Sequence, residues 1–107
     1  MTKARMRWVL AEIRADDTKV FRDRTTGFVE CAAVLRAEVV LMRVGGGPMR
    51  SETIRVEVEP AEALDFHSKD EAEVVKATLA VGHERARRAA EGYDAAYQDA
   101  VAAASGQ

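Results

Sequence analysis

Cysteine is almost absent from this chain of 107 residues, in which Cys31 is the single residue of its kind. An intramolecular disulfide is therefore excluded, and so is a paired-cysteine motif for metal binding or redox chemistry. Cys31 falls on the apolar side of a predicted strand, where burial makes a thiol unreactive. We interpret it as a core residue and not as a nucleophile.

Long apolar runs are also missing. No stretch approaches the ~18 consecutive apolar residues that a membrane-spanning helix needs. The short apolar run 8–11 is broken by Glu12 and Arg14, which is unlike the hydrophobic region of a secretory signal. We therefore expect a cytoplasmic protein with no membrane partner.

Motifs for common catalytic chemistries are not found. The sequence has no H-E-x-x-H pair for zinc and no G-x-S-x-G nucleophile turn. Three consecutive glycines, Gly45 to Gly47, could approach a phosphate, but phosphate loops normally lead into a helix and this one leads into a strand-like run. We predict no cofactor, no bound metal, no catalytic residue and no enzymatic activity.

The composition is that of one globular domain. Apolar residues make up 48% of the chain and charged residues 32%. Residues 1–55 carry eleven lysines and arginines against seven acids, whereas residues 56–107 carry five against eleven. We expect a single domain over residues 1–107, with a sheet region at 1–60 and a helical region at 68–104.

An alternating pattern in residues 28–59 predicts an antiparallel hairpin. Every odd position from Val29 to Leu41 is apolar. Within Thr53–Glu59 the even positions, beginning with Ile54, are apolar and the odd positions are polar or charged. The loop 45–48, Gly-Gly-Gly-Pro, separates the two runs. Because the first run exceeds the usual strand length, we expect a bend or bulge near Ala32–Ala33.

The segment before this hairpin predicts shorter strands. A helix over residues 5–15 would begin with basic residues and end at Asp16–Asp17, the wrong signs for the helix dipole, so we predict a strand there. Residues 16–19 are typical of a turn. A short strand at Val20–Arg22 then forms a hairpin with Phe28–Glu30 through the turn Asp23–Gly27.

The C-terminal third predicts a helix. Ser68 and Glu71 match a capping box, and apolar residues keep helical spacing to about residue 104. An unbroken helix of this length would reach about 50 Å, so we expect either a break at Gly82 or a projecting second half. The fold class is thus α+β: a three- to four-stranded antiparallel sheet with this helix on one face.

We carry three functional hypotheses, and the first is a non-enzymatic protein–protein interaction module. Such a small adaptor, inhibitor or assembly protein would act by surface contact, as a homodimer through the C-terminal helix and an exposed strand edge. Small side chains permit close helix packing, and tyrosines suit partly hydrated interfaces. The interaction residues predicted on the helix are Arg85, Arg88, Tyr93, Tyr97 and Val101.

Two other functional classes stay open. A nucleic-acid-binding protein would use basic residues of the N-terminal half, although the net charge of −2 is unlike that of typical binders. An enzyme or small-ligand binder would use Asp65, His67 and His83, which lack the spacing of known ligand motifs. The candidate residues for nucleic-acid contact are Lys3, Arg5, Arg7, Arg22 and Arg24.

Overall fold

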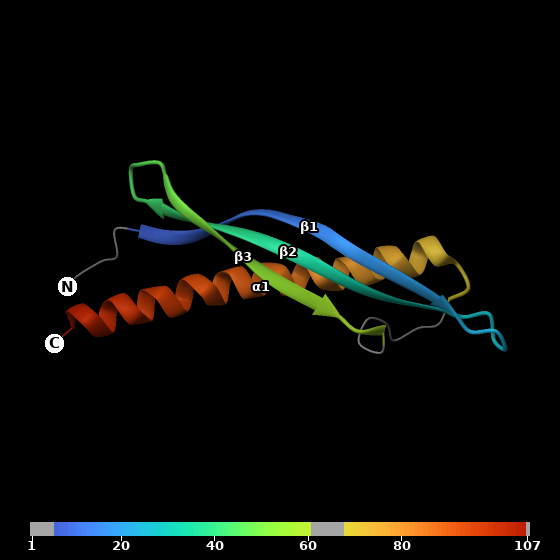
Figure 1. Ribbon diagram of the computed structural model, residues 1–107. Coiled ribbons are helices and arrows are strands. Elements are labelled where there is room, and N and C mark those ends of the chain that lie inside the picture. Colours follow the sequence, from blue (N-terminus) through green and yellow to red (C-terminus); the bar gives the residue numbers. More distant parts are fainter. Residues whose placement is uncertain (1–5, 61–67, 107) are drawn as a thin grey trace.

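The computed structural model describes residues 6–60 and 68–106, which form three strands and one long helix. The strands pair in one antiparallel sheet in the order β1-β2-β3, and the helix packs along one face of it (Figure 1). The predicted α+β architecture is therefore confirmed, with three strands. The elements are β1 (Met6–Arg22), β2 (Val29–Arg43), β3 (Pro48–Val58) and α1 (Glu71–Ser105).

The molecule is elongated. Its principal extents are 62 × 26 × 14 Å and its radius of gyration is 18.3 Å, whereas a compact domain of this length has a radius of about 13 Å. The shape follows from the element lengths, because β1 has 17 residues and α1 has 35. One helix laid along such long strands covers one face of the sheet, and among the described residues no element covers the other face (Figure 1).

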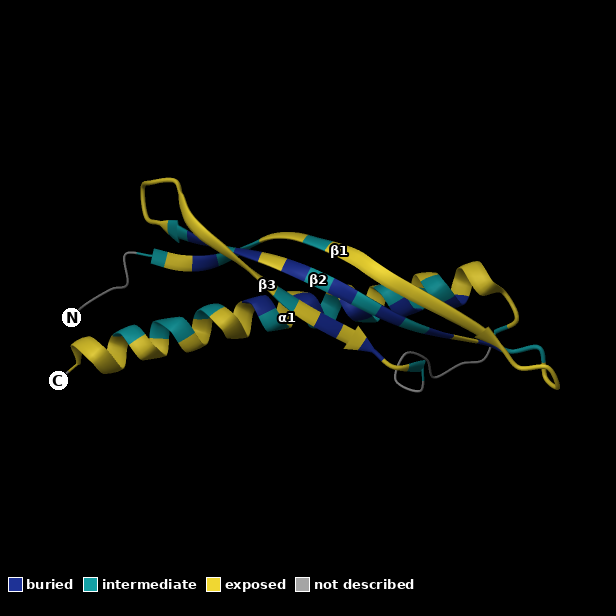
Figure 2. Ribbon diagram, viewed as in Figure 1, coloured by how far each residue is buried: buried dark blue, intermediate teal, exposed yellow. Residues whose placement is uncertain are grey.

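The core lies between α1 and the covered face of the sheet (Figure 2). The alternation predicted for β2 is confirmed, because every odd position from Val29 to Leu41 is buried. From the helix, the buried residues follow one another at intervals of four, a spacing that turns slowly around the helix axis and so follows the twist of the sheet. These helix residues are Val74, Thr78, Gly82, Ala86 and Ala90.

The helix is continuous through Gly82, so of the two alternatives expected from the sequence the break at Gly82 is not found. A Cβ atom at residue 82 would lie 2.3 Å from Leu35 Cδ1 on β2, closer than two carbon atoms can approach. Glycine at this position lets α1 and the central strand come together. The packing against Leu35 outweighs the cost of about 1 kcal/mol that glycine carries inside a helix.

The N-terminal half of the sheet differs from the prediction in one respect. The segment expected as a strand, a turn at 16–19 and a second short strand is one continuous strand, β1. Its pairing with β2 shifts between Leu10 and Glu12 and again between Ala15 and Asp17. The extra residue at Asp16 is accommodated as a bulge instead of a chain reversal, because Thr18 and the residues after it continue to pair with β2. The bulge predicted in β2 near Ala32–Ala33 is wrong, because Ala32 and Ala33 pair with Lys19 and Thr18 without a register shift.

Both predicted hairpin connections are confirmed. In the first, Arg22 pairs with Val29, and the Gly27 amide donates to the Asp23 carbonyl at 2.8 Å. In the second, β3 pairs with β2 from Val58 opposite Ala33 to the start of the strand at residue 48. Gly27 and Gly45 adopt φ of 79° and 77°, a left-handed conformation that glycine takes without steric cost.

The helix begins two residues later than the predicted cap at Ser68. Asp70 is the N-cap, and its side chain accepts a hydrogen bond from the Glu73 amide at 3.3 Å. Ser68 Oγ instead accepts from the Asp70 amide at 3.0 Å and donates to Glu73 Oε2 at 3.3 Å. Aspartate caps a helix as well as serine does, and Asp70 with Glu73 repeats the capping-box spacing, so the signal was correct and the position was displaced.

Candidate functional site

The face of the sheet opposite α1, which we call the helix-free face, is not covered by any element of residues 6–60 and 68–106 (Figures 1 and 2). Because side chains alternate along a strand, the residues between the buried ones point to this face. The register brings them into rows that cross all three strands. In β2 these residues are Glu30, Ala32, Val34, Arg36, Glu38, Val40 and Met42.

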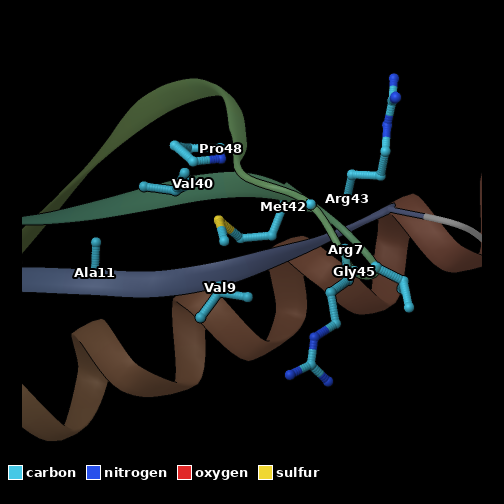
Figure 3. A pocket seen from close by; sticks show the side chains of 10 residues that line it. Arg7, Val9, Ala11, Val40, Met42, Arg43, Gly45 and Pro48 are labelled. Carbon is cyan, nitrogen blue, oxygen red and sulfur yellow. The ribbon is translucent and has the colours of Figure 1, made fainter.

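An apolar groove of about 800 Å³ occupies the end of the helix-free face nearest the β2–β3 loop. Figure 3 shows Val40 and Met42 of β2 and Pro48 of β3 beside the Val9–Ala11 stretch of β1. Arg7 also lines the groove, and its guanidinium end is directed away from Val40 and Pro48 (Figure 3). We call this feature the hairpin groove; its lining is completed by Arg43, Val44, Gly45 and Gly46.

Apolar residues in the hairpin groove are only partly covered by the chain itself. Val9, Val40 and Met42 are half-buried, and Val44 is 71% exposed. Antiparallel sheets with one face in solvent normally present polar side chains there. A contiguous apolar surface on such a face is typical of an interaction or binding site.

A row of three arginines crosses the middle of the helix-free face. Arg14, Arg36 and Arg55 lie opposite one another on β1, β2 and β3. Like charges in adjacent strands repel, and acidic neighbours offset this repulsion. Arg36 Nε lies 3.0 Å from Asp16 Oδ2 without hydrogen-bond alignment, and Arg55 lies 3.5 Å from a Glu57 carboxylate oxygen.

Acidic rows flank the arginine row on both sides. Glu12 and Glu38 lie opposite each other on the side nearer the hairpin groove, and Asp17 and Glu57 occupy the next row on the other side. Positive and negative rows thus alternate along the face. Such a pattern carries little net charge but fixes the positions at which a complementary surface fits.

The strand edges are less suited to pairing with another chain than the face is. β1 is an edge strand, and its two bulges interrupt the regular row of backbone groups that a new strand would need. β3 forms the other edge and has a register shift opposite Leu41 and Met42. Bulges of this kind commonly protect edges against strand addition.

The five interaction residues predicted on α1 make contacts of different kinds within the chain. Tyr93 and Tyr97 pack edge-on against Trp8, with ring centroids 5.0 Å and 6.5 Å away. Arg85 donates to the Glu57 carbonyl at 3.0 Å, and Arg88 donates to a Glu84 carboxylate oxygen at 3.1 Å. The remaining predicted residue, Val101, is half-buried near the end of the helix. The two tyrosines thus contribute to the fold, although Tyr93 is still 37% exposed.

The structure separates the basic residues that were predicted to contact nucleic acid. Arg7 lies at the hairpin groove, whereas Arg22 is the last residue of β1 at the opposite end of the sheet. The two are about 50 Å apart, because fifteen residues of extended strand separate them. Arg22 donates to the carbonyls of Gly27 and Lys69, at 2.8 Å and 3.1 Å, and so supports the first hairpin. Arg24 lies in that hairpin turn. Lys3 and Arg5 fall outside the described residues.

The predicted acid–base cluster is not assembled from described residues. His83 is exposed on α1, and Asp65 and His67 lie outside the described residues. Within residues 6–60 and 68–106, no three His, Cys, Asp or Glu side chains come close enough together to hold a metal ion. In the same part of the chain, no helix is both long and apolar enough to cross a membrane.

The residues of the hairpin groove were not predicted from the sequence, although a signal for them exists. The alternating pattern of β2 predicts that its odd positions are buried. Val34, Val40 and Met42, at even positions, are also apolar. A strand that is apolar on both faces is typical of burial on both faces. The contribution of Val9 and Ala11 is harder to foresee, since the bulge after Leu10 sets which side each residue faces.

No protein-family model, no curated protein and no solved structure matches this chain. We therefore infer its function from its own surfaces, of which the hairpin groove combines exposed apolar residues with an ordered pattern of charges.

Proposed function

We propose that this chain is a non-enzymatic protein–protein interaction module, a small adaptor, inhibitor or assembly protein that forms homodimers and binds through the helix-free face. The observation that carries the proposal is the hairpin groove, where Val9, Val40 and Met42 form an apolar surface that none of the described strands or the helix covers. Removing such surface from water favours association by roughly 25 cal/mol per Å².

The surroundings of the groove resemble the anatomy of protein interfaces. An apolar centre is bordered by charged side chains, with Arg7 and Arg43 at one end and Glu12 and Glu38 at the other. Protein interfaces combine a centre depleted in charge with a polar rim. The rim charges set the orientation and the rate of association more than the affinity.

The helix offers a second surface with weaker support. The rings of Tyr93 and Tyr97 are engaged with Trp8, which leaves Arg88, the exposed edge of Tyr93 and Val101 as groups for a partner. An interaction role for the five helix residues stays a prediction. The helix-free face is favoured because its apolar residues serve no comparable contact within the chain.

The two alternative classes gain less support. Nucleic-acid binding needs a continuous basic surface, and the described candidates Arg7, Arg22 and Arg24 are divided between opposite ends of the sheet. The helix-free face between them alternates in charge. An enzymatic role near His83 has no metal-binding cluster of described residues to support it.

Native mass spectrometry and sedimentation velocity of the full chain test the proposal. We expect a species at twice the 11.7 kDa chain mass with no additional bound mass. Val40→Asp should abolish that species, because a charge in the groove must be desolvated on association, while circular dichroism stays native. Phe21→Asp is the matched control, since Phe21 is a 50% exposed apolar residue in the row at the far end of the same face.

Two results would contradict this function. Bound metal, small ligand or nucleic acid in the native mass would favour one of the alternative classes. Equal loss of association in the Val40→Asp and Phe21→Asp variants would show that the groove has no particular role in binding.

A further inference from the structure

Resting on the proposed function, we propose that the occupant of the hairpin groove is the groove of a second copy. The two sheets stack face to face about a two-fold axis that runs across the strands at Val40. Arg7 of each copy then faces Glu12 of the other copy. The helices lie on the outer sides of the resulting four-layer dimer.

The order of residues along the helix-free face carries this inference. Arg7 lies opposite Met42, the next row pairs Val9 with Val40, and the row after it pairs Glu12 with Glu38. The apolar row is thus bordered on one side by Arg7, which shares its row with Met42 and Pro48, and on the other side by Glu12 and Glu38. A surface of this kind is complementary to itself when one copy is turned end to end.

The alternative orientation is unfavourable. An axis running along β2 would place each β2 residue opposite its own counterpart, so that Glu38 would face Glu38 and Arg36 would face Arg36. Like charges brought together at an interface cost several kcal/mol. Turning one copy end to end about Val40 replaces these contacts with Arg7 opposite Glu12, which attract each other.

The rows along β2 are compatible with the end-to-end arrangement. Arg36 lies two rows beyond Val40, and on the other side the same distance along β2 leads to the loop 44–47, which contains no charged residue. Met42 falls opposite Glu38, where its long side chain can cover the aliphatic part of the glutamate. Stacked sheets pack about 10 Å apart with strands rotated by about 30°, which keeps rows near the axis in register.

A charge-exchange experiment tests the orientation on the full-length chain. Arg7→Glu alone and Glu12→Arg alone should each weaken dimerisation at least tenfold in a micromolar sedimentation series, because each places like charges opposite each other twice per dimer. The double variant Arg7→Glu with Glu12→Arg should return to within about threefold of the unmodified chain. Arg24→Glu and Glu91→Arg are matched controls at exposed sites far from the groove and should change dimerisation less than twofold.

A cross-link tests the axis independently of charge. Val40→Cys should form a covalent dimer with a short bifunctional maleimide reagent that spans about 10 Å, since residue 40 of one copy lies opposite residue 40 of the other across sheets about 10 Å apart. Glu30→Cys, at the far end of the same strand and face, should remain monomeric on a non-reducing gel. The native Cys31 is 1% exposed and does not interfere.

The possible outcomes separate this inference from the function on which it rests. Rescue by the double variant together with the Val40→Cys link would support the arrangement. A dimer that persists unchanged in the Arg7→Glu and Glu12→Arg variants, or an additive loss in the double variant, would overturn the arrangement and leave the homodimer intact. An unmodified chain that is monomeric at all concentrations would overturn both the arrangement and the homodimer.

Discussion

Gly82 of α1 lies directly against Leu35 of β2, so that a methyl group at residue 82 would stand 2.3 Å from Leu35 Cδ1. Leu35 is fully buried at the centre of the middle strand. The close approach at this point sets the distance between helix and sheet, and it explains why a residue unfavourable in helices occupies the middle of the longest element.

Replacing Gly82 with alanine should destabilise the fold. The overlap with Leu35 costs about 1–3 kcal/mol, which exceeds the gain of about 1 kcal/mol in helix propensity. Gly92 is the matched control, because a Cβ there meets no atom within 4 Å, and Gly92→Ala should stabilise the protein by about 0.5–1 kcal/mol. Urea unfolding measures both free energies. Equal stabilisation by the two variants would contradict the close packing of α1 on β2.

Asp94 ties the second half of α1 to the first strand. Its Oδ1 accepts hydrogen bonds from the Trp8 amide at 2.8 Å and from Gln98 Nε2 at 3.2 Å. Asp94→Ala should lower the free energy of unfolding by about 1–2 kcal/mol, since the Trp8 amide loses its acceptor in a partly buried place. Asp94→Asn keeps an acceptor oxygen and should cost less. Identical losses in the two variants would show that the hydrogen bond contributes little.

The turn at Asp23 should respond to acid. The backbone amides of Thr26 and Thr25 donate to Asp23 Oδ1, at 2.9 Å and 2.8 Å, and lower the pKa of this carboxyl below its usual value. A lowered pKa in the folded state means that the stabilisation is complete above the unfolded value of about 3.9. The stabilisation is lost as the pH falls through the folded pKa.

Comparison with Asp23→Asn isolates this effect, because asparagine accepts the same hydrogen bonds without titrating. The difference in unfolding free energy between the two proteins should shrink between pH 5 and the folded pKa, and NMR titration of the Asp23 carboxyl locates that pKa. A difference that stays constant with pH would contradict the role of the two amides.

Local sequence patterns were sufficient to predict the hairpin of β2 and β3. The alternation of apolar and polar residues around Leu35 and Ile54 indicates that one face of each strand is buried. Gly45 indicates where the chain reverses between the two strands. Both signals lie within a few residues of the structure that they indicate. The same holds for the helix start, where Asp70 and Glu73 repeat the capping spacing that was assigned to Ser68.

Features that depend on distant contacts could not be predicted in this way. Asp16 and Asp17 are typical turn residues, yet the chain continues straight because Thr18 and its successors pair with β2, and Asp16 approaches Arg36 twenty residues away. Each bulge also changes the parity of β1, so that inward residues are even before Ala11, odd between the two bulges and even again from Thr18 onward. The position of Gly82 depends similarly on Leu35, which lies 47 residues earlier.

The candidate site was partly visible in the sequence. Val40 and Met42 break the alternation of β2 and so indicate a second apolar face. Val9 joins them only because of the bulge in β1. Tyr93 and Tyr97, which were predicted as interface residues, pack against Trp8 of the same chain. A stripe of apolar residues at helical spacing indicates which side of a helix is buried. It does not indicate whether the surface that buries this side belongs to the same chain or to another.

Two truncations separate the structural role of α1 from its role in association. Removing residues 83–107 takes away Ala86, Ala90 and the two tyrosines that cover Trp8, so we expect loss of the folded state by circular dichroism and a red shift of Trp8 fluorescence. Removing residues 99–107 keeps these contacts and the hydrogen bond from Gln98 to the Met6 carbonyl at 3.1 Å. This shorter truncation should remain folded and dimeric, because the hairpin groove is intact. A folded but monomeric protein after removal of 99–107 would instead place the interface at Val101 and the end of the helix.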